Sequence, residues 1–145
     1  MANAVNKQKA PSKPAQPTKP ADAADAVFID MSQAFQKGDR KRLATLLPQA
    51  KGHILEPWAA FWELRLRLGE ASDNEVKSFL QRYAGTYQED RMRNDWLLLL
   101  GERREWTQFE REYALYRMRD DKEIECYVKL LEVQQKDLNT GASAI

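Results

Sequence analysis

Apolar residues recur every three or four positions through most of this chain, and that spacing predicts amphipathic α-helices. The first helix is expected to begin near Asp22 or Asp25 and to end at Lys37. A short second helix follows Asp39, whose side chain can cap it, and Pro48 ends it. The apolar stripes of these two helices are Val27, Met31, Ala34 and Phe35, then Leu43, Leu46 and Leu47.

The next two helices carry clear start signals. Glu56-Pro57 opens a third helix, because proline is tolerated in the first turn, and Gly69 stops it. Ser72 and Glu75 have the spacing of a capping box, which predicts a fourth helix ending before Gly85. The apolar residues of these helices are Trp58, Phe61, Trp62, Leu64, Leu66 and Leu68, then Val76, Phe79, Leu80 and Tyr83.

Three further helices are expected towards the C-terminus. The fifth, residues 88–100, is apolar nearly all round from Trp96 to Leu100, which indicates packing on several sides. The acidic pair Asp120-Asp121 begins the seventh. The sixth helix is marked by Trp106, Phe109, Tyr113 and Leu115, and the seventh by Ile124, Tyr127, Val128, Leu130, Leu131 and Val133.

Glycines punctuate this pattern at nearly even intervals. Glycine adopts the left-handed conformation just past a helix end without a Cβ penalty, so each is expected to close a helix. Helices ending about every 16 residues make helical hairpins of about 32 residues, the period of stacked helical arrays. We therefore predict an all-α fold, an α-superhelix (solenoid) of stacked helical hairpins with about seven helices, over residues 22–135. The glycines are Gly38, Gly52, Gly69, Gly85 and Gly101.

The two ends of the chain differ from this central part. Prolines recur every third residue from Pro11 to Pro20 among Lys, Ala, Ser and Gln, so residues 1–21 are interpreted as a disordered linker with polyproline II character. After Gln135 the apolar pattern fades, and residues 136–145 are interpreted as the start of a further element or a frayed end. An array without a polar capping repeat exposes apolar surface, so we expect the natural chain to continue.

Charge argues against a nucleic-acid partner. The whole chain has net charge +1, but residues 1–21 hold four Lys and no acid, so the remainder has 19 basic and 22 acidic residues, a net charge of −3. Nucleic-acid-binding domains normally present a basic face. No run approaches the ~20 apolar residues of a membrane-spanning helix, so neither nucleic acid nor a membrane span is expected.

The sequence offers no catalytic constellation, and we expect no catalytic, cofactor-binding or metal-binding residue. His53 is the only histidine and is interpreted as a surface or capping residue; Cys126, the only cysteine, is expected to be buried in an apolar stretch. One His and one Cys cannot make a tetrahedral zinc site. The carboxylate pairs Glu89-Asp90 and Asp120-Asp121 could serve a glycosidase in principle, but their positions favour helix caps.

Two surface features have a structural and a functional interpretation. The pairs Trp58/Trp62 and Trp96/Trp106 lie in apolar helical stripes, which favours packing, although they could stack on sugar rings. A set of arginines most simply makes solvated faces, although some could bind an acidic polymer. These are Arg91, Arg93, Arg103, Arg104, Arg111, Arg117 and Arg119.

Several motifs resemble one protein family. The stretch from Arg93 to Gly101, followed by Trp106 and Phe109, resembles the N-terminal helical domain of soluble lytic murein transglycosylases. In that family a helix ending in Leu-x-x-Gly leads to a turn and then Trp-x-x-Phe. Further matches are Phe35 to Asp39, Leu46 to Pro48, the Pro57 to Leu68 helix, and Glu125-Cys126-Tyr127. The resemblance covers roughly residues 27–133.

The resemblance implies a periplasmic protein whose ring-shaped α-superhelix supports a lysozyme-like domain in the same chain. That domain cleaves the β-1,4 bond between N-acetylmuramic acid and N-acetylglucosamine of peptidoglycan and leaves a 1,6-anhydro end. The family's catalytic motif begins Glu-Ser, a pair that does not occur in this sequence. No catalytic residue is therefore carried over, and these residues alone are expected to be inactive.

A different class of function stays open. A free-standing, TPR-like module would bind a protein or peptide in its groove. Such adaptors repeat polar clamping residues such as Asn at one helical position, whereas only Asn74 and Asn94 occur in the repeats. This sparsity favours the scaffold of a lytic transglycosylase over the adaptor.

Overall fold

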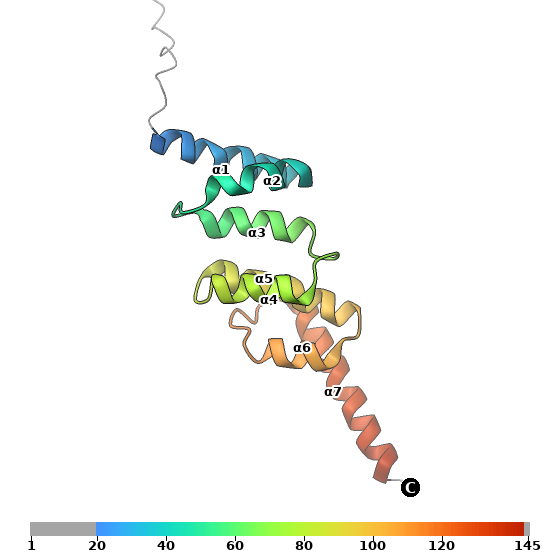
Figure 1. The fold of residues 1–145 in the computed structure, drawn as a ribbon. Helices are drawn as coiled ribbons and strands as arrows, with labels where there is room; N and C mark the ends of the chain where they lie inside the picture. The colour runs from blue at the N-terminus through green and yellow to red at the C-terminus, as the bar shows by residue number, and fades with distance from the viewer. Residues whose placement is uncertain (1–19, 144–145) are drawn as a thin grey trace, which may run out of the picture.

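The computed structural model describes residues 20–143, which form seven α-helices, one short 3₁₀-helix and no strand. This part of the chain is all-α, as predicted, and its helices follow one another down an elongated stack (Figure 1). All but the end of the predicted linker, residues 1–21, lies outside the described residues. The helices are α1 (Pro20–Lys37), α2 (Arg40–Leu46), η1 (Leu47–Ala50), α3 (Glu56–Leu66), α4 (Asp73–Arg82), α5 (Tyr87–Glu102), α6 (Trp106–Tyr113) and α7 (Lys122–Ser143).

Local hydrogen bonds begin these helices where the sequence indicates. The side chain of Asp39 accepts from the backbone N–H of Arg42 and caps α2. Ser72 and Glu75 form the predicted reciprocal capping box of α4. Asp121 Oδ1 accepts from the N–H groups of Glu123 and Ile124 and caps α7. These caps satisfy backbone donors that a helix start leaves unpaired.

The odd-numbered helices form one continuous layer. α1 packs on α3, α3 on α5, and α5 on α7. The even-numbered helices lie beside this layer: α2 packs on α1 and α3, and both α4 and α6 pack on α5. Helix α5 therefore contacts four other helices, which explains why its sequence is apolar nearly all round.

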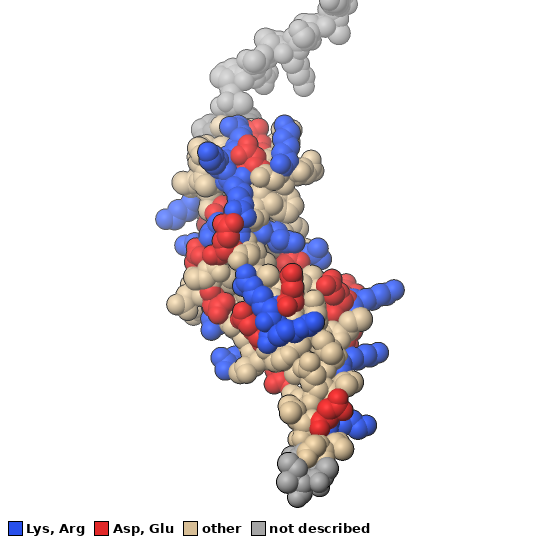
Figure 2. Space-filling model, turned by 90° about the vertical axis from the view of Figure 1, so that its right-hand side faces the viewer, with Lys and Arg blue, Asp and Glu red and all other residues tan. Residues whose placement is uncertain are grey.

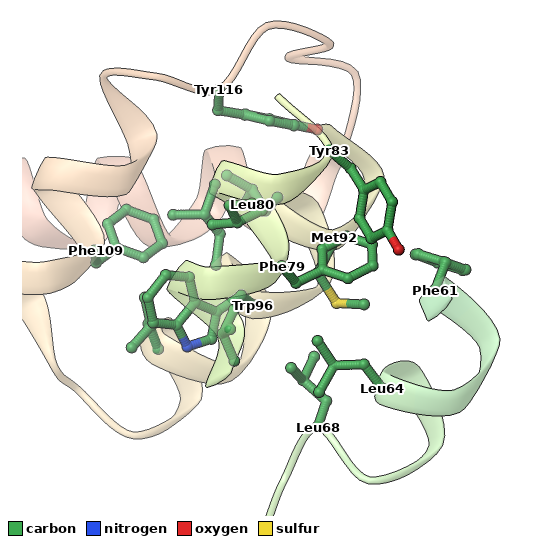
Figure 3. Packing of buried hydrophobic residues seen from close by; sticks show 14 of the residues in the cluster. Phe61, Leu64, Leu68, Phe79, Leu80, Tyr83, Met92, Trp96, Phe109 and Tyr116 are labelled. Carbon is green, nitrogen blue, oxygen red and sulfur yellow. The ribbon is translucent and has the colours of Figure 1, made fainter. Parts of the chain in front are cut away.

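Two hydrophobic clusters stabilise the stack. The larger one joins α3 to α7 around the fully buried ring of Trp96, with Phe109 and Tyr116 on one side and Met92 and Leu64 on the other (Figure 3). The smaller one joins α1, α2, η1 and α3 around buried Met31 and Leu43. Trp62 packs against both clusters and so connects the two ends of the stack.

The glycine prediction is confirmed at three positions and wrong at two. Helix α3 ends at Leu66, before Gly69, and the φ of Gly69 is not positive. Gly38, Gly52 and Gly85 have φ angles of 69°, 82° and 84°, in the left-handed region that favours glycine. Gly101 instead lies inside α5, which continues to Glu102. A Cβ at Gly101 would lie only 2.5–2.8 Å from ring atoms of Tyr127, so this glycine permits close helix packing and ends no helix.

Several apolar residues expected to face inwards are exposed. Helix α6 ends at Tyr113, so Leu115 lies on the connecting segment and is exposed. Helix α7 runs on to Ser143, past the end of the apolar pattern, and its last part points away from the other helices (Figure 1). Val133 is therefore exposed too, and so is Leu138.

Cys126 is exposed, which corrects the expectation of a buried thiol. It lies on α7 two residues after the fully buried Ile124. Successive residues of an α-helix are turned by about 100°, so two positions carry a side chain to the opposite side. An apolar stretch by itself could not show which of its members face the core.

Candidate functional site

The only histidine, His53, links α1 to the start of α3 through two hydrogen bonds. His53 Nδ1 accepts from the backbone N–H of Leu55 at 2.9 Å, so Nε2 carries the proton and donates to Asp25 Oδ1 at 2.6 Å. The ring lies 4.4 Å from that of Phe28. The bond goes to the N-cap residue Leu55, and α3 has no side-chain cap, so the capping interpretation is wrong. The side chain is also mostly buried and does not lie on the open surface.

The two members of the acidic pair Glu89-Asp90, both predicted to cap, have different outcomes. Glu89 behaves as a cap, since its Oε1 accepts from the N–H of Gly85 at 2.7 Å. Asp90 does not: its two oxygens accept from the backbone N–H groups of Arg117 and Met118, at 2.9 and 2.8 Å. Asp90 thus ties α5 to the segment between α6 and α7, a contact between residues far apart in sequence.

A buried ionic cluster joins α5 to α6. The guanidinium of Arg93 donates to Glu89 and, at 3.1 Å, to Glu112, and all three residues are buried. Arg93 is therefore not part of a solvated face, which corrects the sequence interpretation. Burial disfavours the ionised form of Glu89, but hydrogen bonds from Arg93 and Gly85 outweigh it and hold the pKa of Glu89 below its usual value.

A second hydrogen-bond network starts at Asn94, the next residue of α5. The Tyr116 hydroxyl donates to Asn94 Oδ1, and Asn94 Nδ2 donates to Asp121 Oδ2 at 3.1 Å. Burial first, and then the nearby charges of Asp120, Asp121 and Asp90, raise the pKa of Tyr116 to about 12. Within the described residues every buried side-chain nitrogen and oxygen has a hydrogen-bond partner. A fully satisfied network of this kind rigidifies a fold.

Two of the motifs that carry the family resemblance, the one from Arg93 to Phe109 and the one around Tyr127, meet at one junction. The Tyr127 ring covers Gly101, and its centroid lies 6.2 Å from both Trp106 and Phe109. The guanidinium of Arg104 lies over the rings of Trp106 and Tyr127 at 5.6 and 5.7 Å. Helices α5, α6 and α7 are thus joined by these residues, and the packing interpretation of Trp96 and Trp106 is confirmed.

A second aromatic group runs across the layer of odd-numbered helices. The Phe35 ring of α1 lies 6.3 Å from that of Trp62, which lies 6.0 Å from Trp58; the Trp58 ring lies 5.7 Å from that of Tyr87 on α5. We call Phe35, Trp62, Trp58 and Tyr87 the aromatic row. Its first three members are half-buried, and Tyr87 is 54% exposed.

Charged side chains border the aromatic row. Arg91 lies one helical turn after Tyr87, is exposed, and has no ion-pair partner among residues 20–143. Arg65, one turn beyond Trp62, pairs with Asp95 of α5 at 3.0 Å. The row therefore combines apolar ring surface with the unpaired cation of Arg91, and the ion pair of Arg65 links α3 to α5.

A hollow of about 440 Å³ lies between α3 and α4. Arg67 spans it and donates to Glu63 at 2.6 Å and to Glu75 at 2.7 Å. The hydrogen bond to Glu63 outweighs the cost of burial, and the pKa of Arg67 is raised. Three charged side chains of this hollow pair with one another. A charged ligand therefore finds no unpaired partner among Arg67, Glu63 and Glu75, whereas Arg91 beside the aromatic row has no ion-pair partner in the described part of the chain.

Residues 20–143 contain neither a cluster of metal-binding side chains nor a membrane-spanning helix. The described part holds no group of three or more His, Cys, Asp or Glu placed to bind a metal ion. No helix there is both long and apolar enough to cross a bilayer. On the face seen in Figure 2, cationic and anionic side chains are interspersed along the length of the molecule.

Sequence reasoning found two members of the aromatic row and missed its extent. Trp58 and Trp62 were recognised as a pair, but Phe35 and Tyr87 belong to other helices, and only packing brings them together. The buried cluster had one signal, the polar run Arg93-Asn94-Asp95 inside a helix expected to be covered on several sides.

Comparisons with protein-family models, curated proteins and solved structures give no match for this chain. The resemblance to lytic transglycosylases therefore rests on the quoted motifs.

Proposed function

We propose that this chain is the N-terminal α-superhelical scaffold of a periplasmic lytic transglycosylase. In this proposal the helices form stacked hairpins that lie along a peptidoglycan glycan strand and support a lysozyme-like domain of the same protein. That domain cleaves the bond between N-acetylmuramic acid and N-acetylglucosamine. The residues of this chain supply shape and binding surface, and none of them is catalytic.

The observation that carries the proposal is the junction of α5, α6 and α7. Gly101, Trp106 and Phe109 belong to one motif of the resemblance and Tyr127 to another, yet the Tyr127 ring contacts all three. Residues that share one packing unit are expected to occur together in a family, because each fits the others. This contact favours a common evolutionary origin of the motifs over a chance match of unrelated short sequences.

The layer of odd-numbered helices supports the superhelical part of the proposal. In stacked helical hairpins each unit contacts mainly its neighbours, and a continuous surface results. The successive contacts from α1 through α3 and α5 to α7 have this form. A compact bundle would instead pack its first and last helices together, whereas α1 and α7 lie at opposite ends of the stack (Figure 1).

The proposal is tested by release of anhydromuropeptides from purified sacculi. The chain alone should release none. Added to the separately purified lysozyme-like domain of a soluble lytic transglycosylase, it should raise the amount of 1,6-anhydro product released. A matched amount of serum albumin is the control. An unchanged release in the presence of the chain, or release by the chain alone, would contradict the proposal.

A further inference from the structure

We propose that the aromatic row is a glycan-binding site, in which the rings of Phe35, Trp62, Trp58 and Tyr87 stack on successive sugars of a β-1,4-linked amino-sugar strand. This inference rests on the proposed function for its choice of ligand and names the residues that would contact it.

The spacing of the rings favours a linear polymer of sugars. Consecutive centroids are 6.3, 6.0 and 5.7 Å apart, slightly more than the length of one pyranose unit in an extended β-1,4-linked strand. Consecutive rings are tilted by 31°, 32° and 41°. Each face of a pyranose carries C–H groups that suit the electron-rich face of an aromatic ring.

The location of the row gives the strand a continuous path. Its rings come from α1, α3 and α5, three successive helices of one layer, so a ligand lying on them crosses the helices along the direction of the stack. A contiguous apolar patch on a protein surface often marks a binding site. Tyr87 is the most exposed ring of the row, and the other three are half-buried and keep part of their surface accessible.

The charges beside the row select among polymers. Arg91, exposed and without an ion-pair partner among the described residues, can pair with a carboxylate of a peptide attached to the strand. A single cation is a weak attraction for a nucleic acid, whose binding proteins neutralise many phosphates. The net charge of −3 beyond residue 21 also disfavours binding to a nucleic acid.

The test is a titration of the chain with chitohexaose, a soluble β-1,4-linked amino-sugar oligomer, followed by tryptophan fluorescence and calorimetry. We expect Tyr87→Ala to weaken binding about 3- to 10-fold, the worth of one aromatic contact. Tyr87→Phe, which keeps the ring face, should bind as the unchanged chain does. Leu115→Ala, an equally exposed apolar residue outside the row, is the control. Equal affinity of Tyr87→Ala and the unchanged chain would overturn the site.

A second titration isolates the cation. Glycan strands that retain their peptides should bind Arg91→Ala more weakly than the unchanged chain, while chitohexaose should bind both alike. Arg111→Ala, an exposed arginine of α6, is the matched control and should change neither affinity. Tighter binding of single-stranded oligonucleotide than of either glycan would overturn the assignment. The chain could raise the release of 1,6-anhydro product from sacculi while Tyr87→Ala leaves glycan affinity unchanged. That combination would support the proposed scaffold and reject this site.

Discussion

The ring of Tyr127 lies directly on the bare Cα of Gly101, so that a Cβ at this glycine would come within 2.5 Å of the ring. This contact sets the separation of α5 and α7. The ring also touches Trp106 and Phe109, so one glycine allows three helices to meet.

Replacement of Gly101 by Ala is expected to destabilise the fold. Alanine improves helix propensity by about 1 kcal/mol, but the Tyr127 ring must move, and overpacking of this kind costs about 1–3 kcal/mol. We predict a net loss of about 1 kcal/mol in the free energy of unfolding, measured by urea denaturation. Gly69→Ala is the matched control, since a Cβ there meets nothing within 4 Å and its φ is not positive. A Gly101→Ala variant as stable as the control would contradict the close contact.

Asp90 is predicted to hold the segment between α6 and α7 in place. Asp90→Asn keeps the size of the side chain but replaces one acceptor oxygen by a donor that faces the N–H of Arg117 or Met118. Loss of a hydrogen bond to a charged group costs about 1.5–3 kcal/mol. Limited trypsin digestion should cut the variant after Arg117 and Arg119 faster than the unchanged chain. Asp137→Asn on exposed α7 is the control, and equal cutting of the two variants would count against the tether.

Arg93→Met should be among the most damaging single changes in this chain. It leaves Glu112 buried without a cation and leaves Glu89 with only the more distant Arg117, at 3.7 Å. Breaking a buried ion pair by removing one partner costs about 3–5 kcal/mol. Adding Glu89→Gln and Glu112→Gln to Arg93→Met should recover most of that loss in thermal melts, because the unpaired charges are then gone. A triple variant as unstable as the single one would show that the arginine acts through packing instead.

The loss of folding stability at acid pH is expected to depend on Glu89. Its pKa in the folded chain lies below the ordinary value of 4.5, so the folded state binds its proton less readily than the unfolded state. The stabilisation is complete above pH 4.5 and is lost as the pH falls towards the lower, folded pKa. Urea midpoints measured between pH 5 and pH 3 should therefore fall less steeply for Glu89→Gln. Parallel slopes for the two chains would reject this assignment.

The loss of folding stability at alkaline pH is expected to depend on Tyr116. Its pKa is about 12 in the folded chain and 10.0 ordinarily, so the folded state keeps the phenol proton longer. Stability from this group is intact below pH 10 and is lost as the pH rises towards 12. Tyr116→Phe should show a smaller loss of stability between pH 10 and pH 12. It should also be less stable at neutral pH, because the Asn94 oxygen loses its donor.

The sequence predicts the helices well and their contacts poorly, for a physical reason. Caps such as Ser72 with Glu75 are local, so their residue spacing is enough to locate a helix start. Periodicity likewise identified the buried stripe of α4. The role of Gly101 depends on Tyr127, which lies on another helix, and no local pattern distinguishes a glycine that ends a helix from one that lets a ring approach.

The polar side chains show the same limit. Arg93 and Arg111 look alike in the sequence, but only Arg93 meets two buried carboxylates, one of them from α6. Tyr87, next to the cap Thr86, gave no sign that it would continue a row begun by Phe35 on α1. Such features arise from tertiary packing, which is set by the whole chain.

Sedimentation of the purified chain with peptidoglycan sacculi tests the scaffold account most directly. At micromolar concentration the chain should pellet with sacculi and be displaced by soluble glycan strands, while serum albumin stays in the supernatant. A chain that remains in the supernatant at every sacculus concentration would contradict the proposed role as the glycan-contacting scaffold of a lytic transglycosylase.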